Sequence, residues 1–188
     1  MIEHALKEWA AVCRALAAGR QSILVRKGGI AEPGGTFRLE ATRFWMWPTY
    51  VHQAETGVRS EERRFQEDAE RDRPAAGIVR LSEWAEVTGI YQVRDPIIAQ
   101  MLAHLHVWSE AAIAKRYAYR TPGVDVMSVR VHRATPIEIA ETAEHAGCKS
   151  WVRIGEHATT GSAPVLTDAE YRDVIGQLDT LLRPTARV

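Results

Sequence analysis

The chain has 188 residues with 24 basic and 24 acidic side chains, so its formal net charge at pH 7 is zero, and 46% of its residues are hydrophobic. This composition excludes a disordered tail and a generally basic protein that coats DNA. The length fits one domain, or one domain with a small appendage. No apolar run reaches the roughly 18 residues of a membrane span, and the first residues do not resemble a secretion signal. We therefore expect a cytoplasmic protein whose Cys13 and Cys148 are reduced thiols.

The first third of the chain is expected to form one helix and then short strands. Apolar side chains recur at spacings of three and four and predict a helix that stops at Gly19. The members of this stripe are Ala5, Trp9, Val12, Cys13 and Leu16. Three strands then follow, separated by glycine-rich turns and ended by Pro48. They are expected over residues 22–26, 37–41 and 44–47.

The middle of the chain begins with a strongly charged segment. Residues 59–73 carry six acids and five arginines, which is typical of a solvated helix or a flexible loop. Strands are expected over residues 78–81 and 84–91, and Asp95-Pro96 is a typical helix start because Pro suits the first helical position. The expected buried face of that helix consists of Ile97, Ile98, Met101, Leu102 and Leu105.

The last third is expected to mix the two kinds of element. A short helix from Ser109 is followed by strands over residues 124–131 and 150–154. Thr167 and Glu170 form a capping box at the start of a terminal helix. The apolar face of this helix consists of Val174, Ile175, Leu178, Leu181 and Leu182. The irregular alternation of elements favours an α+β fold with a mostly antiparallel, barrel-like sheet and flanking helices.

The segment Arg26-Lys27-Gly28-Gly29 is the first candidate site. Two cations precede two glycines, whose backbone can approach a ligand closely and can form an anion-binding nest. An ordinary hairpin turn with two solvated cations explains the same residues. Residues 14–53 contain six bases and two acids, so positive charge collects in this part of a neutral chain.

The segment Phe44 to Gln53 is the second candidate. Its tryptophans are typical of a core, whereas Thr49, Tyr50, His52 and Gln53 are harder to assign to one. Tyr can stack on a nucleobase while His and Gln bind its edge, and His52 also suits a general base. A polar strand end is the alternative interpretation.

Support for a nucleophile, a metal site or a nuclease motif elsewhere in the sequence is weaker. Cys148 beside Lys149 fits a nucleophile with a lowered pKa, but a lone packed Cys explains it as well. No set of Cys, His and carboxylates has the spacing of a metal site, so no metal or other cofactor is expected. A nuclease would need an acid-x-Lys pair after an acid, and Glu32 and Glu40 lack it, since Glu40 is followed by Arg43.

With these motifs, the sequence resembles the bacterial family catalogued as domain of unknown function 1802. The resemblance rests on residues 5–9, 24–30, 48–53 and 147–151 and spans about residues 3–154. Residues 16–26 are also similar to the helix-to-strand opening of ASCH domains in the PUA-like superfamily. This second resemblance implies a β-barrel with a cleft for RNA or modified bases, in a family where some members hydrolyse acylated cytidine. The family's Gly-x-Lys-x-x-Thr pattern has Gln21 and Leu24 here in place of Lys and Thr.

The sequence therefore predicts a PUA-like α+β domain over residues 1–160 with a C-terminal helix, 161–188, packed on it. We expect it to bind RNA, single-stranded nucleic acid or a modified nucleotide and to have no membrane partner. The expected binding residues are Arg26, Lys27, Gly28, Gly29, Arg43, Thr49, Tyr50, His52 and Gln53. The alternative is a nuclease or nucleobase hydrolase that uses His52 or Lys27 with Glu32 or Glu40.

Overall fold

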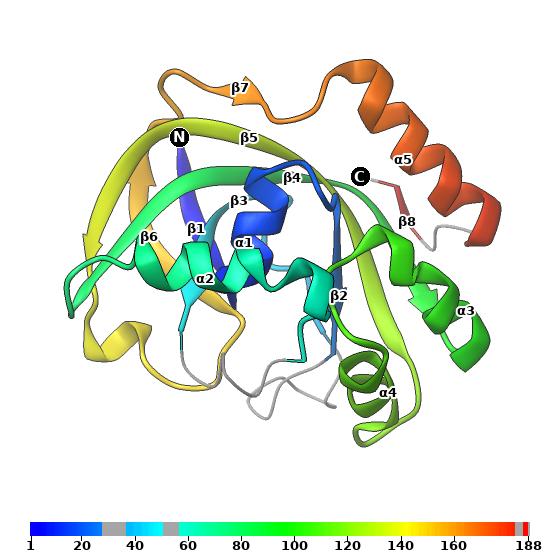
Figure 1. Cartoon of the computed structure of the whole chain (residues 1–188). Coiled ribbons are helices and arrows are strands. Elements are labelled where there is room, and N and C mark those ends of the chain that lie inside the picture. Colours follow the sequence, from blue (N-terminus) through cyan, green and yellow to red (C-terminus); the bar gives the residue numbers. More distant parts are fainter. Residues whose placement is uncertain (28–36, 51–56, 183–185, 188) are drawn as a thin grey trace.

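The computed structural model describes residues 1–27, 37–50, 57–182 and 186–187 (Figure 1). Its strands are β1 Ile2–Trp9, β2 Ile23–Arg26, β3 Arg43–Thr49, β4 Ile78–Val93, β5 Val124–Ala140, β6 Trp151–His157, β7 Ala163–Pro164 and β8 Ala186–Arg187. Its α-helices are α1 Ala10–Ala17, α2 Arg64–Arg71, α3 Pro96–Met101, α4 Glu110–Ala118 and α5 Asp168–Leu181. Short 3₁₀-helices span η3 Ser60–Glu62, η4 Leu102–Leu105 and η5 Ala143–His145.

One sheet holds the described strands together. Its order is β2-β5-β4-β3-β1-β6, with β7 on β5 and β8 on β4, and β1–β3 is the parallel pair among antiparallel neighbours. Figure 1 shows β4 and β5 arching side by side across the molecule, with α1 and α2 together on one side. The α+β class and the mostly antiparallel sheet are confirmed. The described strands curve but do not close, because β2 and β6 share no backbone pairing.

The N-terminal helix prediction is wrong for residues 5–9, which belong to β1. This strand lies between β3 and β6, and Ala5 and Leu6 are both fully buried because its two faces are covered. The apolar residues of β1 do not alternate strictly with its polar residues, and Ala5 and Trp9 match the helical spacing by chance. The helix begins only at Ala10, and Gly19, at φ +71°, follows its end as predicted.

Other predictions also need correction. Pro48 does not end the strand before it, because β3 runs through Pro48 to Thr49. Residues 37–41 form no strand, although Phe37 and Leu39 still pack against the core. The two strands expected over residues 78–91 are one strand, β4, whose bulge between Leu81 and Glu83 interrupts the alternation that a sequence shows.

The face expected to be buried on the helix after Pro96 is also partly wrong. Ile97 and Met101 are 65% and 47% exposed, whereas Leu102 and Leu105 are buried. The chain passes into the 3₁₀-helix η4 at Leu102, which turns the later side chains inward.

The predicted starts of the later helices and the predicted character of the charged segment agree with the structure. Asp95, Ser109 and Thr167 cap α3, α4 and α5, and the capping box at Thr167 is present. The charged segment 59–73 contains η3 and α2, held by buried Phe65 and Ala69. None of the described helices is long and apolar enough to span a lipid bilayer.

Candidate functional site

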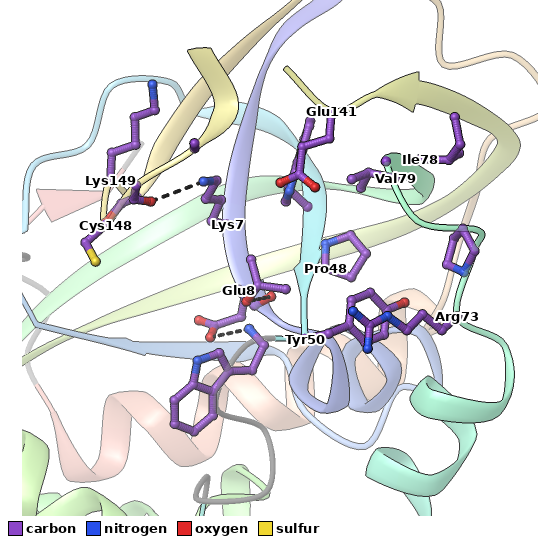
Figure 2. A pocket seen from close by; sticks show the side chains of 18 of the residues that line it. Lys7, Glu8, Pro48, Tyr50, Arg73, Ile78, Val79, Glu141, Cys148 and Lys149 are labelled. Atoms are coloured by element: carbon purple, nitrogen blue, oxygen red, sulfur yellow. Dashed lines mark hydrogen bonds between the residues drawn. The ribbon is translucent and has the colours of Figure 1, made fainter. Parts of the chain in front are cut away.

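A cavity of about 700 Å³ lies where the ends of β1, β2 and β3 meet the segments that precede β4 and β6. Figure 2 shows Tyr50 and Arg73 at one end of the cavity and Lys7, Cys148 and Lys149 at the other. The wall between them includes Pro48, Ile78 and Val79. The cavity therefore offers a polar end and a more apolar, aromatic end.

Positive side chains dominate the charged lining. Six bases face two acids in a protein whose formal net charge is zero. The bases are Lys7, Arg26, Lys27, Arg73, Arg116 and Lys149, and the acids are Glu8 and Glu141. Converging positive charge in a hollow with low-dielectric walls raises the local concentration of anions.

Arg26 and Glu8 form the floor of the cavity. Arg26 Nη1 lies 2.9 Å from Glu8 Oε2, and Arg26 Nη2 donates to Ser150 Oγ at 2.8 Å. The side chains of Arg26 and Glu8 are only 11% and 3% exposed. Thr49 Oγ1 donates to the Glu8 carbonyl at 3.1 Å, which ties β3 to the same point. Because Arg26 ends β2 and Ser150 precedes β6, this network bridges the two unpaired edges of the sheet.

Arg116, on α4, adds a second guanidinium to the floor. Its Nη1 donates to the Val25 carbonyl at 2.6 Å, and its Cζ lies 4.3 Å from the ring centre of Trp108 and 5.6 Å from that of Trp9. Burial lowers the pKa of Arg116; the Glu8 carboxylate raises it and the Arg26 charge lowers it. Arg116 therefore binds the backbone next to Arg26 and lines the same cavity as Arg26 and Glu8.

Lys7 and Lys149 stand at the polar end. Lys7 Nζ donates to the carbonyls of His145 and Gly147, and Lys149 Nζ donates to that of Glu144. Burial lowers the pKa of Lys7, which Glu141 raises and Lys149 lowers. Cys148, which precedes Lys149 in the chain, is exposed, and its side chain points away from the Lys149 amine in Figure 2. The amines hold the backbone of the turn before β6, so this turn is fixed around the cavity.

Tyr50 and Arg73 form the aromatic end. The Arg73 Cζ lies 4.5 Å from the centre of the Tyr50 ring, and burial raises the pKa of the Tyr50 hydroxyl. Arg73 is also 3.5 Å from Glu70 and remains about half exposed. A flat aromatic face beside a solvent-accessible guanidinium suits a planar ligand that carries negative charge.

The structure brings together some of the predicted site residues. Arg26, Lys27, Thr49 and Tyr50 all line the cavity. The Lys27 amine, however, donates to three carbonyls, those of Tyr117, Thr121 and Gly123, at the end of α4. Burial lowers the pKa of Lys27, as does Arg94.

Other predicted residues lie elsewhere. Arg43 begins β3 far from the cavity lining, with its Cζ 4.8 Å from the ring of Trp84, and Glu40 is exposed outside the lining. The predictions for Gly28, Gly29, Glu32, His52 and Gln53 fall outside the described residues.

Sequence reasoning missed the roles of Lys7, Glu8, Arg73 and Arg116. Lys7 and Glu8 were hidden by the helix assigned to residues 5–16, because the strand ends of a curved sheet converge only in three dimensions. Arg73 and Arg116 stand in charged helical surroundings without a motif. A metal site finds no support within the described residues, where no three His, Cys, Asp or Glu side chains cluster.

The described structure defines an α+β protein with a curved, mostly antiparallel sheet and a cationic cavity at the seam between its edges. The chain belongs to the family described as Domain of unknown function (DUF1802), whose model matches residues 5–177. No curated protein matches it.

Solved structures similar to this chain are those of the ASCH protein from Zymomonas mobilis and of two of its single-residue mutants. The unmutated Zymomonas mobilis protein has 12% sequence identity to this chain and a TM-score of 0.47, with 96% of each chain covered. One mutant has 12% sequence identity and a TM-score of 0.49, covering 96% of each chain. The other has 13% identity and a TM-score of 0.47, covering 97% of this chain and 100% of the mutant's chain. These neighbours carry the ASCH name that the sequence resemblance suggested, but such identities transfer neither a ligand nor a reaction.

Proposed function

We propose that this protein binds RNA, single-stranded nucleic acid or a modified nucleotide in the cavity. The observation that carries the proposal is the cluster of six bases and two carboxylates around one hollow of a neutral protein. Phosphate neutralisation by Lys and Arg supplies most of the sequence-independent affinity for nucleic acids. These six bases gather in one cavity, which suits a bound segment or a single nucleotide rather than a coat along a duplex.

The aromatic end supports the same ligand class. Tyr50 lies against Arg73, and Trp9 lies against Arg116, so two aromatic rings of the lining each stand beside a guanidinium group. Bases stack on aromatic rings irrespective of sequence, and Arg adds a cation–π contribution. We assign stacking to Tyr50 and phosphate contacts to Arg26 and Arg73. Gly28 and Gly29 near phosphate and His52 and Gln53 at base edges remain predictions, as does a cytoplasmic location.

The enzyme alternative receives less support. The Lys27 amine lines the cavity but directs its hydrogen-bond donors at three backbone carbonyls, and Glu40 is outside the lining, so neither is placed to act as a base on a ligand. His52 and Glu32 lie outside the described residues. Nucleic-acid or nucleotide binding without turnover is therefore the function that we favour.

Fluorescence anisotropy with labelled single-stranded RNA, single-stranded DNA and duplex DNA tests the proposal. We expect single strands to bind at low salt, with the logarithm of the affinity falling by about 0.7 per neutralised phosphate for each unit of log salt. Arg73→Ala is expected to weaken binding and reduce this slope. Arg71→Ala is the matched control, because Arg71 is also an exposed, acid-paired arginine but lies outside the lining. The proposal fails if no nucleic acid or nucleotide binds at low salt.

A further inference from the structure

The floor of the cavity contains more positive than negative charge. Two guanidinium groups, of Arg26 and Arg116, stand beside one carboxylate, of Glu8, in surroundings that exclude most water. Glu8 compensates one of these charges. An uncompensated charge with little solvent is unfavourable, and an anion that enters the cavity would offset it.

The same floor has unused hydrogen-bond donors. A guanidinium has five N–H groups, and Arg26 uses Nη1 for Glu8 and the Lys7 carbonyl and Nη2 for Ser150. Its Nε is buried and has no partner among the described residues. Among the described residues, Arg116 makes one hydrogen bond, to the Val25 carbonyl, and is otherwise held against the rings of Trp108 and Trp9. Arg116 thus reaches the peptide group that joins Val25 to Arg26.

We propose that Arg26 and Arg116, beside Glu8, form a subsite for a terminal phosphate group. This inference rests on the proposed function and specifies which part of the nucleotide binds at the floor of the cavity. A terminal phosphate carries about −1.5 to −2 charges at pH 7 and three acceptor oxygens, and guanidinium groups bind such oxygens in a fork. An internal phosphodiester carries only one charge and has two non-bridging oxygens, so it would offset less of the positive charge of the floor and accept fewer hydrogen bonds there.

The rest of the cavity fits the remainder of the ligand. The lining continues from the floor past Trp9 and Pro48 to Tyr50 and the apolar residues Ile78 and Val79. With the phosphate on the floor, the base would lie toward Tyr50. The phosphate source is either a free mononucleotide or the end of a strand, since both present the same group.

Binding of one short, internally labelled single-stranded RNA in three forms tests the subsite. The RNA carries a 5′-phosphate, a 3′-phosphate or hydroxyls at both ends, and the wild-type full chain is titrated with each. Because charge-assisted hydrogen bonds are the strong ones, we expect one phosphorylated form to bind at least about tenfold more tightly than the hydroxyl form. Equal affinities for all three forms would overturn the subsite but leave the proposed function standing. No binding of any form, nor of AMP, would overturn both.

Competition identifies the source of the phosphate. Displacement of the phosphorylated RNA by AMP but not by adenosine supports the subsite and indicates a mononucleotide-sized ligand. Displacement only by phosphorylated oligonucleotides supports it and indicates a strand end. Displacement by adenosine as effective as that by AMP contradicts it, because the phosphate would then contribute nothing.

Substitutions of Arg116 test whether the floor of the cavity causes the preference for phosphorylated RNA. Arg116→Gln is expected to remove most of the preference for the phosphorylated RNA, and Arg116→Lys to retain part of it. Lys115→Gln is the control, since Lys115 is the neighbouring, exposed cation on α4 and lies outside the lining. Circular dichroism melts check that each variant folds. A folded Arg116→Gln protein with an unchanged preference contradicts the assignment, and the wild-type comparison decides the matter if that variant does not fold.

Discussion

Glu8 and Arg26 form a buried ion pair between strands that are not neighbours in the sheet, with 2.9 Å between Oε2 and Nη1. Arg26 also reaches Ser150, next to the opposite edge strand β6. Side chains therefore close the seam that backbone hydrogen bonds leave open. The cavity lies at this seam, so the groups that hold the curved sheet together also form the floor of the candidate site.

Removing only one member of this ion pair should strongly lower the free energy of unfolding. Arg26→Ala leaves the Glu8 carboxylate buried without its cation, which is expected to lower the free energy of unfolding by about 3–5 kcal/mol. The double variant Glu8→Gln/Arg26→Ala removes both charges and should lose less than the sum of the two single variants. Urea denaturation of the four proteins of this cycle, with Glu8→Gln as the fourth, measures the coupling. Additive losses would show that the two charges do not stabilise each other.

Stacking on Tyr50 has a separate consequence for binding. Tyr50→Ala removes the ring at the aromatic end and is expected to weaken binding of single-stranded RNA by about 1–3 kcal/mol, whereas Tyr50→Phe keeps the ring and most of the affinity. Tyr119→Ala is a matched control, because Tyr119 also lies against an arginine, Arg120, but is outside the lining. Fluorescence anisotropy measures the affinity of the wild type and of these three variants for the RNA. Equal losses for Phe and Ala at position 50 would indicate that the hydroxyl, not the ring, is recognised.

Local signals in the sequence predicted the helix caps at Asp95, Ser109 and Thr167, because capping depends on neighbours in the chain. The fold class followed from the irregular alternation of elements. The site was predicted only where it coincides with a motif, as at Arg26 and Tyr50. Lys7 and Arg116 enter the cavity through the curvature of the sheet and the docking of α4, which depend on contacts far apart in the chain.

The proposal that residues 161–188 pack as a helix on the preceding domain can be tested at Leu178. Leu178 is fully buried on α5, and the neighbouring Tyr171 hydroxyl lies 2.6 Å from Thr88 Oγ1 on β4. Leu178→Ala is expected to lower the free energy of unfolding by about 2–5 kcal/mol. Arg172→Ala, on the exposed face of the same helix, should change it by less than about 0.5 kcal/mol. Denaturant titrations compare the two variants, and similar small effects would show that α5 contributes little to the fold.

His106 makes stability depend on acid pH. Burial and the charges of Arg59, Arg116 and Arg20 lower the pKa of His106 to about 3. Its Nδ1 accepts a hydrogen bond from the Trp108 backbone N–H at 3.2 Å, so the folded state needs the neutral ring. The unfolded chain binds a proton below its pKa of about 6.5, and the folded protein does not until about pH 3. Stability is therefore lost as the pH falls through this interval.

His106→Asn removes this titration while keeping an acceptor for the Trp108 N–H. Between pH 8 and pH 5, the wild type should lose about 2 kcal/mol more of its free energy of unfolding than the variant. The other titrating groups are common to both proteins, so their contributions cancel in the difference. Urea denaturation at several pH values measures it. Parallel pH profiles would mean that His106 binds its proton equally well in the folded protein, contrary to the burial of its ring.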